Sequence, residues 1–253
     1  PQAVITTTPK PIPLIKQLLS RKDVFVTRGS TFENEENLAE SALEMMRERY
    51  EGTTLGRQEL YAEVVEDVDG ALWSPSLIDN ARLSPDTEKE LTNIIVAIDP
   101  AVTTNANSDE TGIIVVGKDQ RNHFYVLEDS SGKWTADQWA RKAINLFYDW
   151  DADRIVAETN NGGDLVERLL RNFDVNIPYR SVQATRGKLV RAEPIASLYE
   201  QRRVHHLGVF SELESQMCTY TGQLRPSPDR LDALVWGLTE LSKSKGQINW
   251  RIS

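Results

Sequence analysis

An uninterrupted apolar run, IIVAI at residues 94–98, ends abruptly in Asp99. A strand with apolar residues at successive positions is buried on both faces, which requires covering layers above and below its sheet. The run therefore predicts a central strand of an α/β domain. It also places a charge at the carboxyl end of that strand.

The residues around this strand indicate a mixed sheet. TGIIVVG and HFYVLED follow it after short polar connections, so we expect antiparallel neighbours. A helix at 135–150 leads to the strand RIVAE at 154–158, and a helix at 162–173 leads to a fifth strand at 177–183. The order predicts an α/β fold with a mixed five-stranded sheet and helices on both faces.

The first part of the chain has a different organisation. Short elements alternate there, with strands expected at 3–9 and 23–30 and helices at 12–20 and 37–50. So few strands cannot make a sheet of their own. A Gly, two Ser-Pro steps and many polar residues then indicate a linker. We expect these divisions: a first piece at 1–69, a linker at 70–90, a main domain at 91–246 and a tail at 247–253.

Composition excludes several classes of protein. The 253 residues are 40% hydrophobic and 26% charged, as in an ordinary globular chain. Cys218 is the only cysteine, so internal disulfides and cysteine zinc sites are excluded and a reducing compartment is expected. The net charge of -9 argues against indiscriminate binding to nucleic acid or anionic membrane. No apolar stretch is long enough for a membrane span, and the missing initial Met suggests a fragment or a processed product.

Two carboxylates are expected at one edge of the sheet. Glu158 ends the strand RIVAE, which right-handed crossover rules place parallel to the strand that ends in Asp99. Ligand sites in open α/β sheets favour that edge, and adjacent carboxylates repel unless a cation lies between them. Oxygen ligands suit Mg²⁺ or Mn²⁺. Alternatively, Asp99 starts a turn before Pro100 and Glu158 is a solvated strand end.

The helix SPDRLDALVWGL supplies a third acid. Ser227 is expected as its N-cap and Pro228 as its first residue, so that Asp229 either complements the helix dipole or binds a metal. Asp232 lies one turn in, and we expect it to project away from the core stripe together with Asp229 and Trp236. The residues of that stripe are Leu231, Leu234, Val235 and Leu238.

Several motifs in order resemble the nuclease domain of the large subunit of tailed-phage terminases. They are IIVAIDPAVTTNANSDETGIIVVG, IVAETNNGGDLVERLL, GKLVRAEPIASLYEQRRVHH and SPDRLDALVWGL. Upstream, VITTTPKP, LGRQELYAEVVED and DGALW resemble the end of the ATPase domain of the same family and its connector. The match covers nearly the whole chain. The resemblance implies an RNase H-like fold that cuts concatemeric double-stranded DNA into genome lengths with two Mg²⁺ or Mn²⁺ ions.

The resemblance also implies roles and partners. Asp99, Glu158 and Asp232 correspond to the catalytic, metal-binding acids. Asp109 corresponds to an auxiliary acid, with a hairpin-turn residue as the alternative, and Asp229 to a position held by an acid or a histidine. The implied partners are DNA, a small terminase subunit and a portal protein, in the cytoplasm of a bacterial host and transiently at the procapsid portal. No G-x-x-x-x-G-K-[ST] is present, so ATPase activity is not expected of this chain.

A basic segment is the candidate DNA-binding surface. Lys188 and Arg191 are close enough on a helix to meet phosphates together, and Arg180 and Arg186 lie nearby. The alternative is a solvated helix face whose cations pair with Glu193 and Glu200.

Two other functions are compatible with the sequence. An actin- or sugar-kinase-like ATPase also begins with a strand-end Asp followed by threonines, although no glycine-rich phosphate turn follows here. A docking module of a packaging motor, whose acids have no catalytic duty, is the second alternative.

Overall fold

The computed structural model describes residues 4–7, 13–50, 60–62, 68, 70–100, 110–159, 163–222 and 228–243. The chain forms two compact units, Pro1–Asp69 and Gly70–Ser253. Within the described ranges, every helix is too short or too polar to cross a membrane.

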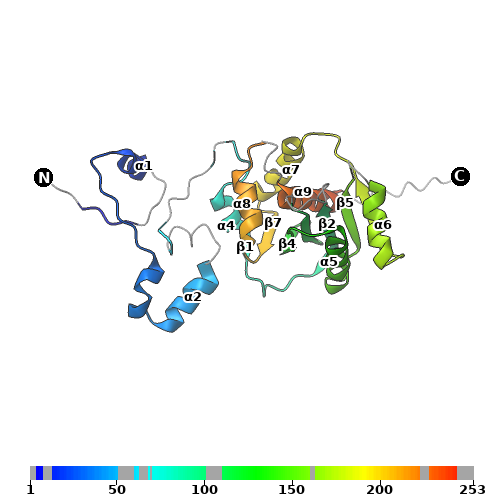
Figure 1. The fold of residues 1–253 in the computed structure, drawn as a ribbon, viewed down its shortest axis with the longest axis horizontal. Helices are drawn as coiled ribbons and strands as arrows, with labels where there is room; N and C mark the ends of the chain where they lie inside the picture. Colours follow the sequence, from blue (N-terminus) through cyan, green and yellow to red (C-terminus); the bar gives the residue numbers. More distant parts are fainter. Residues whose placement is uncertain are drawn as a thin grey trace. The chain divides into compact units, whose positions relative to one another are not determined.

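The elements described in the first unit are helices. It contains α1 (Pro13–Ser20), the 3-10 helix η1 (Thr31–Asn37) and α2 (Glu40–Tyr50) (Figure 1). The strands predicted at 3–9 and 23–30 are not formed in the described residues 4–7 and 23–30. Their apolar residues had suggested strands, but an extended segment becomes a strand only when another segment supplies its hydrogen bonds.

The second unit is built on a seven-stranded mixed sheet in the order β1-β7-β4-β3-β2-β5-β6. β2 pairs antiparallel with β3 and parallel with β5, as predicted from the connections. The α/β class is confirmed, with seven strands in place of five. The strands are β1 (Arg82–Leu83), β2 (Leu91–Asp99), β3 (Gly112–Asp119), β4 (Phe124–Asp129), β5 (Arg154–Glu158), β6 (Tyr179–Val182) and β7 (Val204–Leu207).

The two additional strands lie together at one edge. β7 pairs parallel with β4, and the two-residue β1 pairs parallel with β7. Segment 70–90, predicted as a linker, supplies β1 and the helix α4 (Pro75–Ala81), and its Trp73 and Ile78 are buried in the core. The Ser-Pro step at Ser74 begins α4, because Ser74 caps the helix and Pro75 starts it. The same residues that indicated a linker therefore form a helix start.

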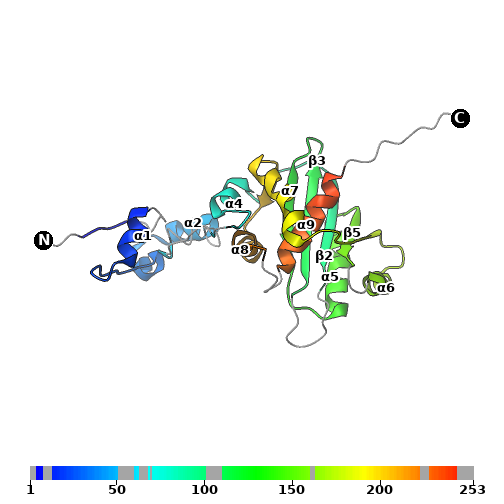
Figure 2. The same ribbon diagram turned by 90° about the horizontal axis from the view of Figure 1, so that it is seen from above.

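Helices cover both faces of the sheet (Figures 1 and 2). On one face, α4 packs with α7 (Lys188–Glu200), α8 (Ser211–Thr219) and α9 (Asp229–Ser242) around one hydrophobic cluster. On the other face, α5 (Ala136–Asp149) and α6 (Gly163–Phe173) pack around a second cluster. The strands between them are apolar at successive positions because each face has its own core.

α9 is buried around its whole circumference over residues 229–238. The predicted core stripe of Leu231, Leu234, Val235 and Leu238 is buried, and so is the other side of the helix, where Asp229, Asp232 and Trp236 were expected. Gly237 allows α9 to pack closely against the sheet. A Cβ at this position would come within 2.7 Å of Val116 Cγ2 on β3 and 3.0 Å of Ala97 Cβ on β2. Pro228 is the cap residue and Asp229 the first helical residue, while Ser227 lies outside the described residues.

A buried polar network fixes α8 against the β1 edge. Arg82 donates two hydrogen bonds of 2.9 Å to Glu214, which also pairs with His206 Nδ1 at 2.9 Å. His206 Nε2 lies 2.8 Å from the Tyr199 hydroxyl. Burial alone would raise the pKa of Glu214, but the bonds from His206 and Arg82 hold this pKa at about 2. Glu214 is thus a charged anchor that ties α8 to β1 and β7.

Candidate active site at the carboxyl edge of the sheet

Strand alternation directs Asp99 and Glu158 toward α9. Successive side chains of a strand face opposite sides. On β2, Ile95 belongs to the α9 cluster and Val96 to the α5 cluster, so Asp99, four residues after Ile95, shares the α9 face. On β5, Val156 belongs to the α9 cluster, and Glu158 therefore faces the same way. Both acids stand one residue beyond the parallel pair formed by Ile98 and Ala157, on neighbouring strands.

α9 brings two further acids to this position. Asp229 and Asp232 lie in its first turn and are 7% and 3% exposed. The approach depends on Gly112, the partner of Asp99 across β2 and β3. A Cβ on Gly112 would lie 2.0 Å from the backbone oxygen of Asp229, so the helix start occupies the space where any other residue would have its side chain.

The burial and the neighbouring carboxylates shift the pKa of Asp99. Burial first, and then repulsion from the carboxylates of Asp232 and Glu158, raise the pKa of Asp99 well above its usual range, while Lys188 opposes the shift. Burial also raises the pKa of Asp232, against the attraction of Lys188 and Arg191. The carboxylates of Asp232 and Glu158 thus disfavour the charged form of Asp99.

Two cations of α7 reach into the acidic cluster. The Lys188 ammonium forms an ion pair with Asp232 Oδ2. Arg191 Nη1 lies 3.4 Å from Glu158 Oε2, and its Nη2 lies 3.6 Å from Asp232 Oδ1. The Arg191 guanidinium also lies 4.4 Å from the centroid of the Trp236 ring, whose Nε1 donates to Glu158 Oε2 at 2.6 Å. α7 therefore pairs these cations with acids of β5 and α9.

The remaining predicted residues are distributed differently. Arg180 pairs with Glu240 at 2.6 Å. Glu240 lies eight residues beyond Asp232 on α9, which is about 12 Å along the helix axis. Arg186 is exposed. Asp109 lies outside the described residues. The structure thus groups Asp99, Glu158, Asp229, Asp232, Lys188 and Arg191, and it places Arg180 toward the opposite end of α9.

The chemistry of the cluster suits a divalent cation. Its donors are carboxylate oxygens, which Mg²⁺ and Mn²⁺ prefer, and their mutual repulsion would be relieved by a cation among them. Among the described residues, no group of three or more His, Cys, Asp or Glu side chains already has the spacing of a metal site. In the described arrangement Lys188 and Arg191 supply the neutralising charge.

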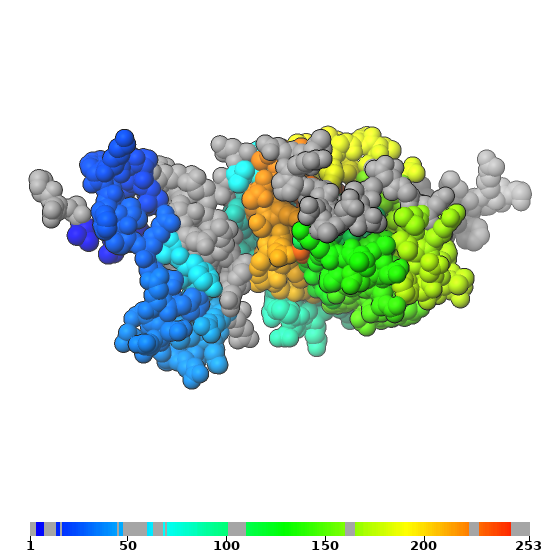
Figure 3. Space-filling view, viewed as in Figure 1, coloured from blue at the N-terminus to red at the C-terminus, as the bar shows by residue number. Residues whose placement is uncertain are grey.

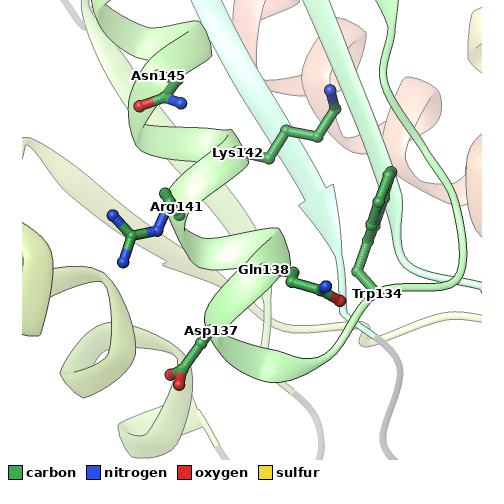
Figure 4. Close-up of a pocket in the computed structure, with 6 residues that line it drawn as sticks. All are labelled: Trp134, Asp137, Gln138, Arg141, Lys142 and Asn145. Atoms are coloured by element: carbon green, nitrogen blue, oxygen red, sulfur yellow. The ribbon is translucent and has the colours of Figure 1, made fainter.

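Two hollows in the described surface lie away from this cluster. One, of about 470 Å³, is lined by Trp134 and the α5 side chains Asp137, Gln138, Arg141, Lys142 and Asn145 (Figure 4). It belongs to the face covered by α5, whose residues form the green surface in Figure 3. The other, of about 480 Å³, lies at the other end of the strands, where β2 begins, beside Thr92, Lys118 and Arg180. Neither hollow is lined by the grouped acids.

Fold and site together define a three-layer α/β domain with acids gathered where two parallel strands end beneath a buried helix. Residues 96–241 match the family model of the terminase RNaseH-like domain, and the chain belongs to that family. The predicted resemblance to terminase large subunits is confirmed, which leaves the actin- or sugar-kinase-like alternative without support. No curated protein matches the chain in sequence.

Solved structures share the fold. The large terminase of a thermophilic bacteriophage aligns with a TM-score of 0.53 at 13% identity, over 83% of this chain and 53% of that one. The nuclease domain of the large terminase subunit of bacterial virus Sf6 aligns with a TM-score of 0.50 at 13% identity, over 66% of this chain and 98% of that one. A mutant of the Sf6 domain with manganese gives 0.51 at 12% identity, with the same coverage. The chain spans about half the length of the thermophilic phage protein.

Sequence reasoning overlooked two residues beside the acids. Gln216, on α8, accepts the backbone N–H of Arg230, and the Arg230 side chain, within the first turn of α9, donates to Asp129 at the end of β4. Arg230 stands between the two predicted acids in PDRLDAL, and that position was the only signal available.

Proposed function

We propose that this chain is the nuclease part of a phage terminase large subunit and cuts concatemeric viral double-stranded DNA during packaging, using two Mg²⁺ or Mn²⁺ ions. The observation that carries the proposal is the grouping of Asp99, Glu158 and Asp232, since β2 and β5 bring the first two side by side and Arg191 contacts both Glu158 and Asp232. Manganese accompanies the mutant Sf6 domain among the structural matches, which supports the choice of metal. Three carboxylates without a nucleophilic Ser or Cys suit metal-assisted hydrolysis of a phosphodiester.

Each side chain has a proposed task in this reaction. Asp99, on the central strand β2, would hold divalent cations together with Glu158 and Asp232. Asp229 is a peripheral ligand. When bound, divalent ions supply an activated water and stabilise the charge on the phosphate and the leaving oxygen. Trp236 holds Glu158 in place through its indole N–H.

The first test is cleavage of supercoiled plasmid by the intact chain without ATP. We expect relaxed and linear DNA with Mn²⁺ or Mg²⁺ and none with EDTA, because the carboxylates alone offer no nucleophile. Calorimetric titration with Mn²⁺ separates this function from a docking module, which has no reason to bind the metal. Cleavage that persists in chelator would sink the proposed metal mechanism.

We further propose that Lys188, Arg191 and Arg186 contact DNA phosphates beside the acids, with Arg180 farther along. A phosphate that approaches the cluster meets several negative charges, and Lys188 and Arg191 are the cations already paired with them. The same residues can therefore exchange a carboxylate partner for a phosphate as metal enters.

Replacement of both Lys188 and Arg191 by Ala should weaken DNA binding equally on all sequences. A plot of the logarithm of the DNA-binding constant against the logarithm of the salt concentration has a negative slope, and each lost phosphate contact reduces its magnitude by about 0.9. For two lost contacts we expect the magnitude to fall by about 1.8. Lys243→Ala is the matched control, because Lys243 pairs with Glu240 at 2.9 Å, toward the far end of α9. Fluorescence anisotropy over a salt series measures both. An unchanged slope in the double variant would place the DNA elsewhere.

The first unit is proposed to be the end of the terminase ATPase domain. It exposes several large apolar side chains, among them Val4, Ile5, Leu14 and Phe25, which suits a surface normally covered by further protein. By the family resemblance, the full assembly includes a small terminase subunit and a portal protein and works in the host cytoplasm, docking at the procapsid portal. ATP hydrolysis is assigned to the full-length protein.

A further inference from the structure

The first turn of α9 has no cap of its own. Pro228 holds the N-cap position and makes no side-chain capping bond. The first N–H groups of a helix need acceptors from outside it. The side-chain oxygen of Gln216, on α8, accepts the N–H of Arg230 at 3.1 Å and that of Leu231 at 3.3 Å. A neighbouring helix therefore caps the turn that carries Asp229 and Asp232.

Arg230 ties the same turn to three other segments. Its Nε donates to Glu110 at 3.0 Å, just before β3, and its Nη1 donates to Asp129 at 2.9 Å, at the end of β4. It also forms an ion pair with Glu212 on α8. The Arg230 side chain is 7% exposed. A guanidinium has a planar fork of donors, so several carboxylates can hold it in one orientation.

The geometry of a helix links these contacts to the acids. Successive residues are about 100° apart around the axis, since a turn holds 3.6 residues. Asp229 and Asp232 share a side, as residues three apart do, while Arg230 is directed to β4 and α8. A rotation or shift of the first turn would therefore move both acids together. α8 can resist such a shift because Glu214 anchors it to Arg82 and His206.

We infer that Arg230 and Gln216 are positioning residues that hold the first turn of α9 so that Asp229 and Asp232 meet Asp99 and Glu158 in a metal-binding arrangement. The inference rests on the proposed nuclease function, since it assigns the acids to cations. Neither residue touches the metal or DNA in this scheme. Both act through the position of the helix start.

The test compares four variants of the intact chain by calorimetric Mn²⁺ titration and thermal melting. Gln216→Met removes the oxygen that caps α9 while the side chain keeps a similar size. Gln216→Glu retains an oxygen that can accept the same N–H groups. Arg230→Lys keeps the charge and loses the fork. Thr135→Ala is the control, because it removes the side-chain N-cap of α5, on the other face of the sheet. All titrations are run well below the lowest melting temperature.

We expect Gln216→Met and Arg230→Lys to weaken Mn²⁺ binding about tenfold and to raise the Mn²⁺ concentration for half-maximal plasmid cleavage by the same factor. Gln216→Glu should bind Mn²⁺ nearly as the parent does. Thr135→Ala should melt earlier and bind Mn²⁺ unchanged. If the Gln216 and Arg230 variants melt earlier but bind Mn²⁺ like the parent, these residues serve stability alone and the inference is overturned.

The parent chain distinguishes this failure from failure of the proposed function. A parent that binds Mn²⁺ and cuts plasmid, with variants that do the same at equal Mn²⁺, refutes only the positioning role. A parent that neither binds Mn²⁺ nor cuts refutes the nuclease proposal, and the inference is overturned with it. If Arg230→Lys does not fold, Gln216→Met still gives the decisive comparison.

Discussion

Asp99→Asn should lower the rate of plasmid cleavage by several orders of magnitude. The metal-free variant should melt at the same temperature as the parent or at a higher one. The carboxylate of Asp99 is the one flanked by both Glu158 and Asp232, and burial and repulsion already disfavour its charge. Asparagine keeps the size of the side chain and an oxygen that accepts hydrogen bonds, but it removes the negative charge that binds a cation. Loss of that charge also relieves the repulsion among the neighbouring carboxylates. Loss of activity with retained stability separates a metal ligand from a structural acid.

Cleavage rates at saturating Mn²⁺ and thermal melting in EDTA measure the two effects. Asp232→Asn should also lose cleavage, but it removes the partner of Lys188 and a neighbour of Arg191, so its stability should fall. Asp229→Asn is the milder comparison, since a first-turn dipole contact contributes only about 0.3 to 1 kcal/mol and water can replace a peripheral ligand. Parental cleavage by a normally folded Asp99→Asn protein would remove Asp99 from the site.

Gly112→Ala should both destabilise the second unit and reduce cleavage. The new Cβ would lie 2.0 Å from Asp229 O and 3.0 Å from Ala233 Cβ, and the first of these atoms is backbone that cannot rotate away. The first turn of α9 must therefore shift. Overpacking of this kind typically costs about 1 to 3 kcal/mol. The shift should also weaken Mn²⁺ binding, because Asp229 and Asp232 move with the turn.

The control for this prediction is Gly187→Ala. A Cβ on Gly187 meets nothing within 4 Å, and its φ of -58° is open to alanine, so only a small change in stability is expected. Urea unfolding of both variants, together with Mn²⁺ titration, measures the difference. A Gly112→Ala protein with the stability and metal affinity of the parent would mean that α9 does not rest on β3 as described.

Some features of this chain follow from local sequence patterns alone. The apolar run before Asp99 predicted a strand covered on both faces, and β2 has that environment. The end of RIVAE and the parallel crossover predicted that Glu158 would neighbour Asp99. These predictions succeed because the apolar pattern of a strand and the length of a connection are properties of contiguous residues. Side chains alternate between the two faces of a strand, so the position of an acid in the strand determines the face to which it points.

Other features required the folded chain. Segment 70–90 has the composition of a linker, yet it becomes α4 and β1, because Trp73 is buried against Tyr199 and Arg82 finds Glu214. α9 has a helical stripe of leucines, yet it is buried all round because α7, α8 and the sheet enclose it. Tyr199 and Glu214 lie more than a hundred residues from Trp73 and Arg82 along the chain, so no local periodicity could identify these contacts.

The candidate site combines the two kinds of information. The identities of Asp99, Glu158 and Asp232 could be read from strand ends and a helix start. The pairing of Lys188 with Asp232, the cap from Gln216 and the contact of Gly112 with the start of α9 could not. Each of these joins elements that meet only when the sheet is assembled and covered. Local sequence places acids at the ends of elements, and long-range packing sets the distances between them, on which cation binding depends.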